Sequence, residues 1–405
     1  MTQELTVATE RVDDIPVLLA EMDQMGVVAL LDERFQPHGN WQGTTLGWTT
    51  AIWLAHILSE GDHRLNQVEP WVAHRLQVLS HCSGQAVREL EWSDDRLGIV
   101  LDALSDGPRW QDLETALNRR IFRVYELKPQ CIRVDSTAAC GYWSVSEDGL
   151  FQFGHSKDHR PDLPQLKVML SALDPLGLPV ATQVVSGERA DDQLYIPAIE
   201  QVSASLDKHG LLYVGDCKMA ALGTRAFIQA QGDYYLCPLA KKQLPDEVLA
   251  SYLKPVWEGS RVPIPIYREN GAGQAELIAE GYEQSVTLTH AVRGQAITWT
   301  ERHLVVRSVQ QAKSMTAALH KRLAQAQAQV ARLNMHKQGK RRYADDEALQ
   351  QAGAALLKGC RVEGLLKLTL VARVKERPVR AYGDRPATLR TEREVSLMHF
   401  NNLTP

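Results

Sequence analysis

The sequence predicts an α/β protein built on a mixed sheet of five strands. The strands are short apolar or alternating runs at residues 131–134, 166–173, 178–185, 211–215 and 234–237. We expect the first three strands to be antiparallel, and a tight turn joins the second and third of them. Helical segments separate the last three runs, and a strand reached through a helix is usually parallel to the strand that it pairs with.

The connections between these runs carry the expected local signals. Residues 174–177, Asp-Pro-Leu-Gly, have the composition of a hairpin turn. A helix is predicted from about Asp192, with Asp191 or Asp192 as its cap, because apolar residues recur at helical spacing up to Leu206. A shorter helix is predicted over residues 220–231. The chain order is therefore strand, strand, strand, helix, strand, helix, strand.

Two aspartates stand at the ends of strands that this order can make neighbours. Asp135 follows the first strand and Asp216 follows the fourth. Pairing of the fourth strand with the first would bring the two carboxylates together, which is the ribonuclease-H-like arrangement. Two carboxylates about 4 Å apart repel by roughly 4 kcal/mol at an intermediate dielectric constant, and a divalent cation removes that repulsion. Hard oxygen ligands suit Mg²⁺ or Mn²⁺, and two such ions, roughly 3.5–4 Å apart, can hold the attacking and leaving oxygens of a phosphodiester.

Four segments of the chain resemble the DDE transposases of bacterial insertion sequences, of the type with two Asp, one Glu and a β-rich insertion before the Glu. These segments are residues 132–137, 154–163, 186–192 and 214–216. The resemblance covers most of the chain, including its N-terminal part, and residues 154–163 are its most specific piece. It implies cut-and-paste DNA transposition by metal-dependent phosphodiester hydrolysis and strand transfer. Asp135 and Asp216 would then be catalytic metal ligands, with two Mg²⁺ (or Mn²⁺) ions in a complete site.

The third carboxylate of the resembled family has no match in the sequence. The family pattern is Tyr, two residues, Arg, three residues, Glu, six residues and Lys, and no Tyr of the chain satisfies it. Tyr382 has Arg385 three residues on, but Leu389 stands where Glu is required. The sequence therefore predicts a truncated reading frame, which stops before the catalytic Glu, and a chain that cannot transpose alone. The downstream acids, none of which we assign, are Glu301, Glu347, Glu363, Glu376, Glu392 and Glu394.

Two basic segments are candidates for contacts with DNA phosphates. The first contains His155, Lys157, His159 and Arg160, and the second contains Lys337, Lys340, Arg341 and Arg342. From spacing alone the first segment is equally well a solvated loop, and the resemblance favours DNA.

The net charge is −4, but the charges are unevenly distributed. Residues 1–60 hold 2 basic and 9 acidic residues, whereas residues 301–385 hold 18 basic and 7 acidic residues. We therefore expect the later half to provide the basic surface that binds DNA. The resemblance implies that the partner is double-stranded DNA, both transposon terminal repeats and target, and that the chain acts as a homodimer on DNA.

Four regions are predicted along the chain. Residues 1–127 form a helical N-terminal domain that is a candidate for DNA-end binding, and residues 128–240 form the first part of the catalytic core. Residues 241–310 form the β-rich insertion, and residues 311–405 form basic helices and a strand of a catalytic domain cut short.

The expected N-terminal helices span 14–31 (interrupted or ended by Gly26), 46–58, 67–79, 94–104 and 109–125. The expected later elements are strands at 262–267, 274–279, 285–289, 296–300 and 304–307, helices at 311–335 and 345–357, and a strand at 366–375; the residues from His399 onward show no apolar periodicity.

Composition limits the other classes of protein. The six Cys residues are scattered without paired spacing, which argues against a zinc site or a disulfide framework and favours the cytoplasm. No signal peptide is visible and no apolar run reaches membrane-spanning length, so no membrane is expected as a partner. Two alternatives to an active transposase stay open: a non-catalytic DNA-binding remnant, and a nuclease of the same fold.

Overall fold

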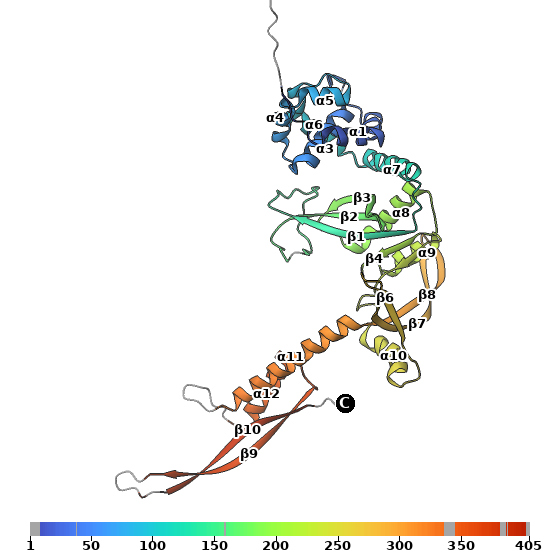
Figure 1. Cartoon of the computed structure of the whole chain (residues 1–405). Coiled ribbons are helices and arrows are strands. Elements are labelled where there is room, and N and C mark those ends of the chain that lie inside the picture. Colours follow the sequence, from blue (N-terminus) through green and yellow to red (C-terminus); the bar gives the residue numbers. More distant parts are fainter. Residues whose placement is uncertain are drawn as a thin grey trace, which may run out of the picture. The chain divides into compact units, whose positions relative to one another are not determined.

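The structure is a computed structural model that describes residues 9–37, 39–157, 159–335, 345–380, 386 and 388–401. The chain divides into two compact units, coloured along the sequence in Figure 1. The first unit comprises Met1–Leu249 and Thr287–Glu301, and the second comprises Ala250–Val286 and Arg302–Pro405. Within the described residues, no helix combines the length and the apolar character needed to cross a membrane.

The first unit begins with a cluster of short helices around an apolar core rich in tryptophan. The helices are α1 (Ile15–Gln24), α2 (Val27–Arg34), α3 (Leu46–Glu60), α4 (Val68–Ala73), α5 (Leu76–Ser83), α6 (Asp94–Leu104) and α7 (Gly107–Val124), with 3₁₀ turns η1 (Leu65–Gln67) and η2 (Glu89–Trp92). The Ser93 side chain accepts a hydrogen bond from Arg96 N and caps α6. Trp53, Trp71 and Trp92 are all buried in this core.

Two of the helices predicted here are interrupted. The helix expected over 14–31 ends before Gly26, whose φ of 77° lies in the left-handed region that favours glycine. The single helix expected over 67–79 is wrong, because α4 ends at Ala73 and α5 begins at Leu76. Arg75, at the break, is buried and forms ion pairs with Asp13 and Glu60. Local periodicity does not report these distant partners, which hold Arg75 at the break.

A five-stranded mixed sheet forms the centre of the first unit (Figure 1). Its strands are β1 (Cys131–Cys140), β2 (Gln165–Asp174), β3 (Leu178–Ser186), β4 (Leu212–Gly215) and β5 (Tyr234–Leu236), in the order β3-β2-β1-β4-β5. β1, β2 and β3 are antiparallel, whereas β4 is parallel to β1 and β5 is parallel to β4. The directions predicted from the turns and helices are therefore confirmed. β1 is six residues longer than predicted, because it stays paired with β2 as far as Cys140.

Helix α8 (Tyr195–Leu206) packs against the sheet, and α9 (Leu222–Ala230) connects β4 to β5. Ile132 and Val134 of β1 share one buried cluster with Tyr195, Ile199 and Val202 of α8. A 3₁₀ turn, η3 (Asp191–Leu194), precedes α8, and neither η3 nor α8 has a side-chain cap. The predicted cap at Asp191 or Asp192 is therefore wrong.

Helix α7 joins the helical cluster to this sheet. Asn118 Nδ2 donates a hydrogen bond of 2.6 Å to Val180 O of β3. The Glu114 carboxylate accepts hydrogen bonds from Thr182 N, at 3.2 Å, and from Gln201 Nε2, at 2.6 Å. Burial raises the pKa of Glu114, and these hydrogen bonds only partly oppose that increase.

Replacing Glu114 by Gln is expected to change how stability depends on pH. A raised native pKa means that the folded wild type binds more protons than the unfolded chain above about pH 4.5, the ordinary value for Glu. Wild-type stability therefore falls as pH rises through the native pKa of Glu114. The Gln carbonyl oxygen can accept both hydrogen bonds without a charge. We expect Glu114→Gln to have the larger free energy of unfolding at about pH 8 and to lose that advantage towards about pH 4.

Urea unfolding at several pH values measures this difference. Glu89→Gln, at an exposed position of η2, serves as the control for a change in overall charge. A difference between Glu114→Gln and wild type that stays constant with pH would contradict the assignment of a raised pKa to Glu114.

The β-rich part contains three strands and one helix, α10 (Asp246–Trp257). The sequence did not predict this helix. The strands are β6 (Ile264–Glu269), β7 (Ala275–Val292) and β8 (Gln295–Ser308), in the order β6-β7-β8. Four of the predicted short strands are wrong as separate elements. Residues 274–279 and 285–289 belong to the single long β7, except Gln274, and residues 296–300 and 304–307 belong to β8.

The last part contains two helices and a two-stranded sheet, which are α11 (Val309–Leu333), α12 (Asp346–Gly359), β9 (Leu366–Val379) and β10 (Thr388–Asn401). Leu323 and Ala326 of α11 pack with Leu357 of α12, so these apolar residues of α11 are buried within their own unit. The sequence did not predict β10, which pairs with β9 along its whole length and extends to Asn401.

Candidate functional site

Asp135 and Asp216 lie at the same level of two adjacent parallel strands. The register pairs Ile132 with Tyr213 and ends with Val134 opposite Gly215. Asp135 and Asp216 are the next residues of β1 and of the chain after β4, and both are exposed. Two aspartates that are distant in the sequence thus flank one point where β1 and β4 separate.

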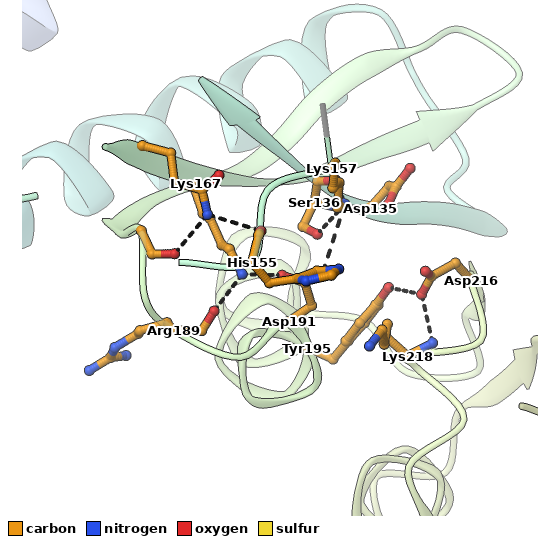
Figure 2. Close-up of polar contacts among 12 residues, drawn as sticks. Asp135, Ser136, His155, Lys157, Lys167, Arg189, Asp191, Tyr195, Asp216 and Lys218 are labelled. Carbon is orange, nitrogen blue, oxygen red and sulfur yellow. Dashed lines mark hydrogen bonds and ion pairs between the residues drawn. The ribbon is translucent and has the colours of Figure 1, made fainter. Parts of the chain in front are cut away.

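Each of these carboxylates is held through one of its two oxygens (Figure 2). Ser136 N donates to Asp135 Oδ1 at 2.7 Å. Lys218 N donates to Asp216 Oδ1 at 2.8 Å, and the Tyr195 hydroxyl donates to the same oxygen at 2.7 Å. Within the described residues, Oδ2 of both aspartates makes no hydrogen bond or ion pair. One oxygen of each carboxylate is therefore available to an added ligand.

Tyr195 is a part of this site that the sequence reading missed. It begins α8 and its side chain is buried, while its hydroxyl reaches Asp216. Burial, the hydrogen bond to Asp216 and the negative charges of Asp216, Asp135 and Asp191 raise its pKa far above the ordinary value. The hydroxyl therefore remains a protonated donor among three carboxylates. In the sequence, an aromatic residue in the first turn of a helix looks like any other core residue.

Asp191 is committed to lysine partners rather than to a helix cap. Its Oδ1 lies 2.7 Å from Lys167 Nζ and its Oδ2 lies 3.8 Å from Lys157 Nζ, and the Asp191 and Lys167 side chains are only 11% and 6% exposed. Burial raises the pKa of Asp191, but Lys167, Lys157 and Lys218 outweigh it and hold the pKa below its usual value. Because two lysines already balance this charge, Asp191 is a poor candidate for a third metal ligand.

Glu301, one of the downstream acids, is also paired. Arg225 of α9 donates through Nη1 to both carboxylate oxygens of Glu301 at 2.6 Å. Both side chains are below 10% exposed. Nearby, Trp299 Nε1 donates to the Tyr235 hydroxyl at 2.7 Å. Glu301 therefore neutralises a buried arginine and attaches the end of the β7–β8 hairpin to the core.

The residues present fit a divalent cation held by two carboxylates. Aspartate oxygens are hard donors of the kind that Mg²⁺ and Mn²⁺ prefer. Among the described residues, however, no group of three or more His, Cys, Asp or Glu side chains is arranged to hold a metal ion. From the part of the chain that the structure describes, the site has Asp135 and Asp216 without a third acidic ligand.

The first basic segment is only partly brought to this site. Lys157 Nζ donates to the backbone oxygen of Ser136 and, at 3.0 Å, to its hydroxyl, so its charge lies next to Asp135. Arg160 instead forms two hydrogen bonds with Asp162, and a backbone oxygen of His155 accepts from Gln165. His159 has a positive φ of 57° in the same loop. The second basic segment, Lys337, Lys340, Arg341 and Arg342, lies outside the described residues.

Comparison with known proteins gives only distant structural similarity. The chain matches no known protein-family model and no curated protein. Among solved structures it is similar to a Mos1 transposase paired-end complex with the left transposon end, at 10% identity and a TM-score of 0.20, covering 62% of this chain and 84% of that chain. It is also similar to piggyBac transposase in a synaptic complex with hairpin DNA, at 9% identity and a TM-score of 0.30, covering 70% of this chain and 60% of that chain.

Proposed function

We propose that the chain is a transposase of the bacterial insertion-sequence DDE class, which cleaves and joins double-stranded DNA with Mg²⁺ or Mn²⁺. One observation carries the proposal: Asp135 and Asp216 follow the last paired residues of adjacent parallel strands. The strand order β3-β2-β1-β4-β5, with β2 antiparallel to both of its neighbours β1 and β3, is the order expected of a ribonuclease-H-like core. Cut-and-paste transposition of an insertion sequence is the activity that fits this core and the resemblance of the sequence.

The residues of the chain have separable roles in this proposal. Asp135 and Asp216 would hold the cation through the oxygens that make no hydrogen bond. A bound divalent cation lowers the pKa of bound water and stabilises charge on phosphate oxygens. Lys157, beside Ser136, supplies a positive charge that can attract a DNA phosphate to the same place. Arginine and lysine side chains elsewhere, and a second copy of the chain, would provide the remaining contacts with DNA.

A second candidate function is a non-catalytic DNA-binding remnant. It is favoured because, among the described residues, no third acid joins the aspartate pair, and Asp191 and Glu301 are held in ion pairs. With only two carboxylates, a metal ion is weakly held and the leaving oxygen is poorly stabilised. In this case the chain would occupy transposon ends without cutting them.

Incubation of the purified chain with labelled duplexes separates these functions. The duplexes should carry the DNA that flanks the coding sequence, with a target plasmid and with Mg²⁺, Mn²⁺ or EDTA. Joined donor and target strands that appear only with the metal support the transposase. Cleavage without joining indicates a nuclease of the same fold, and a gel shift without cleavage indicates the remnant.

A further inference from the structure

We propose that Tyr195 is a positioning residue for Asp216 and sets which carboxylate oxygen binds the cation. This inference rests on the function proposed above, in which Asp216 is a metal ligand. Tyr195 itself does not touch the metal or the DNA in this assignment. It acts through the hydrogen bond of 2.7 Å from its hydroxyl to Asp216 Oδ1.

The first step concerns the freedom of Asp216. A carboxylate held by one donor at the end of a strand can rotate about its last bond and exchange its two oxygens. Asp216 Oδ1 instead receives two donors from different directions, the Lys218 backbone N–H and the Tyr195 hydroxyl. Both donors must be released before the oxygens can exchange. Oδ2 is therefore presented in one orientation, for binding through a single oxygen.

The second step concerns the rigidity of the donor. The Tyr195 side chain is 1% exposed and packs in the same buried cluster as Ile132, Val134 and Ile199. α8 is in turn anchored to β3 and to α7 through Gln201, which hydrogen-bonds both Gln183 and Glu114. The hydroxyl is thus fixed by the core of the unit, on which β1 also packs.

The third step concerns the asymmetry between the two aspartates. Asp135 Oδ1 is held by the N–H of the adjacent Ser136, a contact within its own strand. Asp216 stands where β4 has already ended, so its backbone has lost the pairing that fixes Asp135. The tyrosine supplies, from α8, the restraint that the end of β4 lacks. Groups that orient a metal ligand in this way typically contribute about 10–100-fold to metal affinity.

The test compares Mn²⁺ binding by Tyr195→Phe and by Tyr213→Phe, measured from the free Mn²⁺ signal in electron paramagnetic resonance. Tyr213 is the matched control, because it is buried in β4 and its hydroxyl makes no hydrogen bond to either aspartate. We expect Tyr195→Phe to weaken Mn²⁺ binding by about 10–100-fold, and Tyr213→Phe to leave it unchanged. The Mn²⁺ concentration for half-maximal DNA cleavage should rise in parallel, with a smaller change in the rate at saturating Mn²⁺.

Asp216→Asn separates failure of the inference from failure of the proposed function. Unchanged Mn²⁺ affinity in a folded Tyr195→Phe, with binding lost in Asp216→Asn, overturns the role of Tyr195 and leaves the metal site standing. Equal weakening in both Tyr→Phe variants indicates a general structural effect and also overturns it. Mn²⁺ binding that survives Asp216→Asn overturns the metal site and the role of Tyr195 together.

Discussion

Asp135→Asn and Asp216→Asn are each expected to lower the rate of metal-dependent DNA cleavage by about 10²–10³-fold or more. Each change removes the negative charge of one of two ligands and keeps nearly the same shape. The backbone hydrogen bonds from Ser136 and Lys218 can still be accepted by the Asn oxygen. The expected loss is therefore in cation binding and catalysis rather than in folding. Initial rates of nicking, measured over a range of Mg²⁺ and Mn²⁺ concentrations, give the comparison.

Asp174→Asn is the matched control for this pair of variants. Asp174 ends β2, pairs with Arg133 and lies on the neighbouring strand of the same sheet. Its replacement should leave the cleavage rate within about twofold of wild type, because surface ion pairs contribute little. If Asp135→Asn and Asp216→Asn cleave DNA as fast as Asp174→Asn, the aspartate pair is not the catalytic site.

Arg225→Met is expected to have the largest effect on stability, a loss of about 3–5 kcal/mol in the free energy of unfolding. The substitution leaves the Glu301 carboxylate buried without its cation, at 9% exposure. Arg302→Met is the control, because Arg302 is a neighbour of Glu301 on β8 but pairs with Glu283 at the surface. The loss expected for the control is roughly 0–1 kcal/mol. Urea unfolding of both variants measures the two losses.

The double variant Arg225→Met with Glu301→Met tests the reason for this loss. Buried ion pairs replaced on both sides by apolar residues often cost little, because no charge remains to be desolvated. The double variant should therefore recover much of the stability lost in Arg225→Met. A double variant that is as unstable as the single one would show that packing of the arginine, and not the loss of its charge beside Glu301, accounts for the loss.

The order of the central sheet could be predicted because its signals are local. The turn at Asp174-Pro175-Leu176-Gly177 separates β2 from β3, and helical periodicity separates β3, β4 and β5. These signals determine the strand directions, and the directions bring Asp135 and Asp216 to one level. The sequence therefore predicted the aspartate pair without knowledge of any distance.

The rest depends on contacts between residues that no local pattern links. The Tyr195 hydroxyl, at the start of α8, donates to Asp216 at the end of β4. Asp191 precedes the predicted helix and therefore looks like a cap in the sequence, whereas its partner Lys167 lies on β2. β7 and β8 each continue through polar positions, so their predicted halves appeared as separate strands. β10 has no clear periodicity of its own and is defined by its pairing with β9.

The single parallel contact of β1 with β4 also bears on the order in which the protein folds. β1, β2 and β3 follow one another in the chain, so they can pair early, whereas β4 must wait for the crossover through α8 to close a long loop. Asp135 and Asp216 therefore meet only after the long crossover between β3 and β4 has closed. A cation that binds the pair binds the native state alone, and at a hundred times its dissociation constant it adds about 2.7 kcal/mol to the stability. In the proposed function, the catalytic ion would thus also stabilise the pairing of β4 with β1.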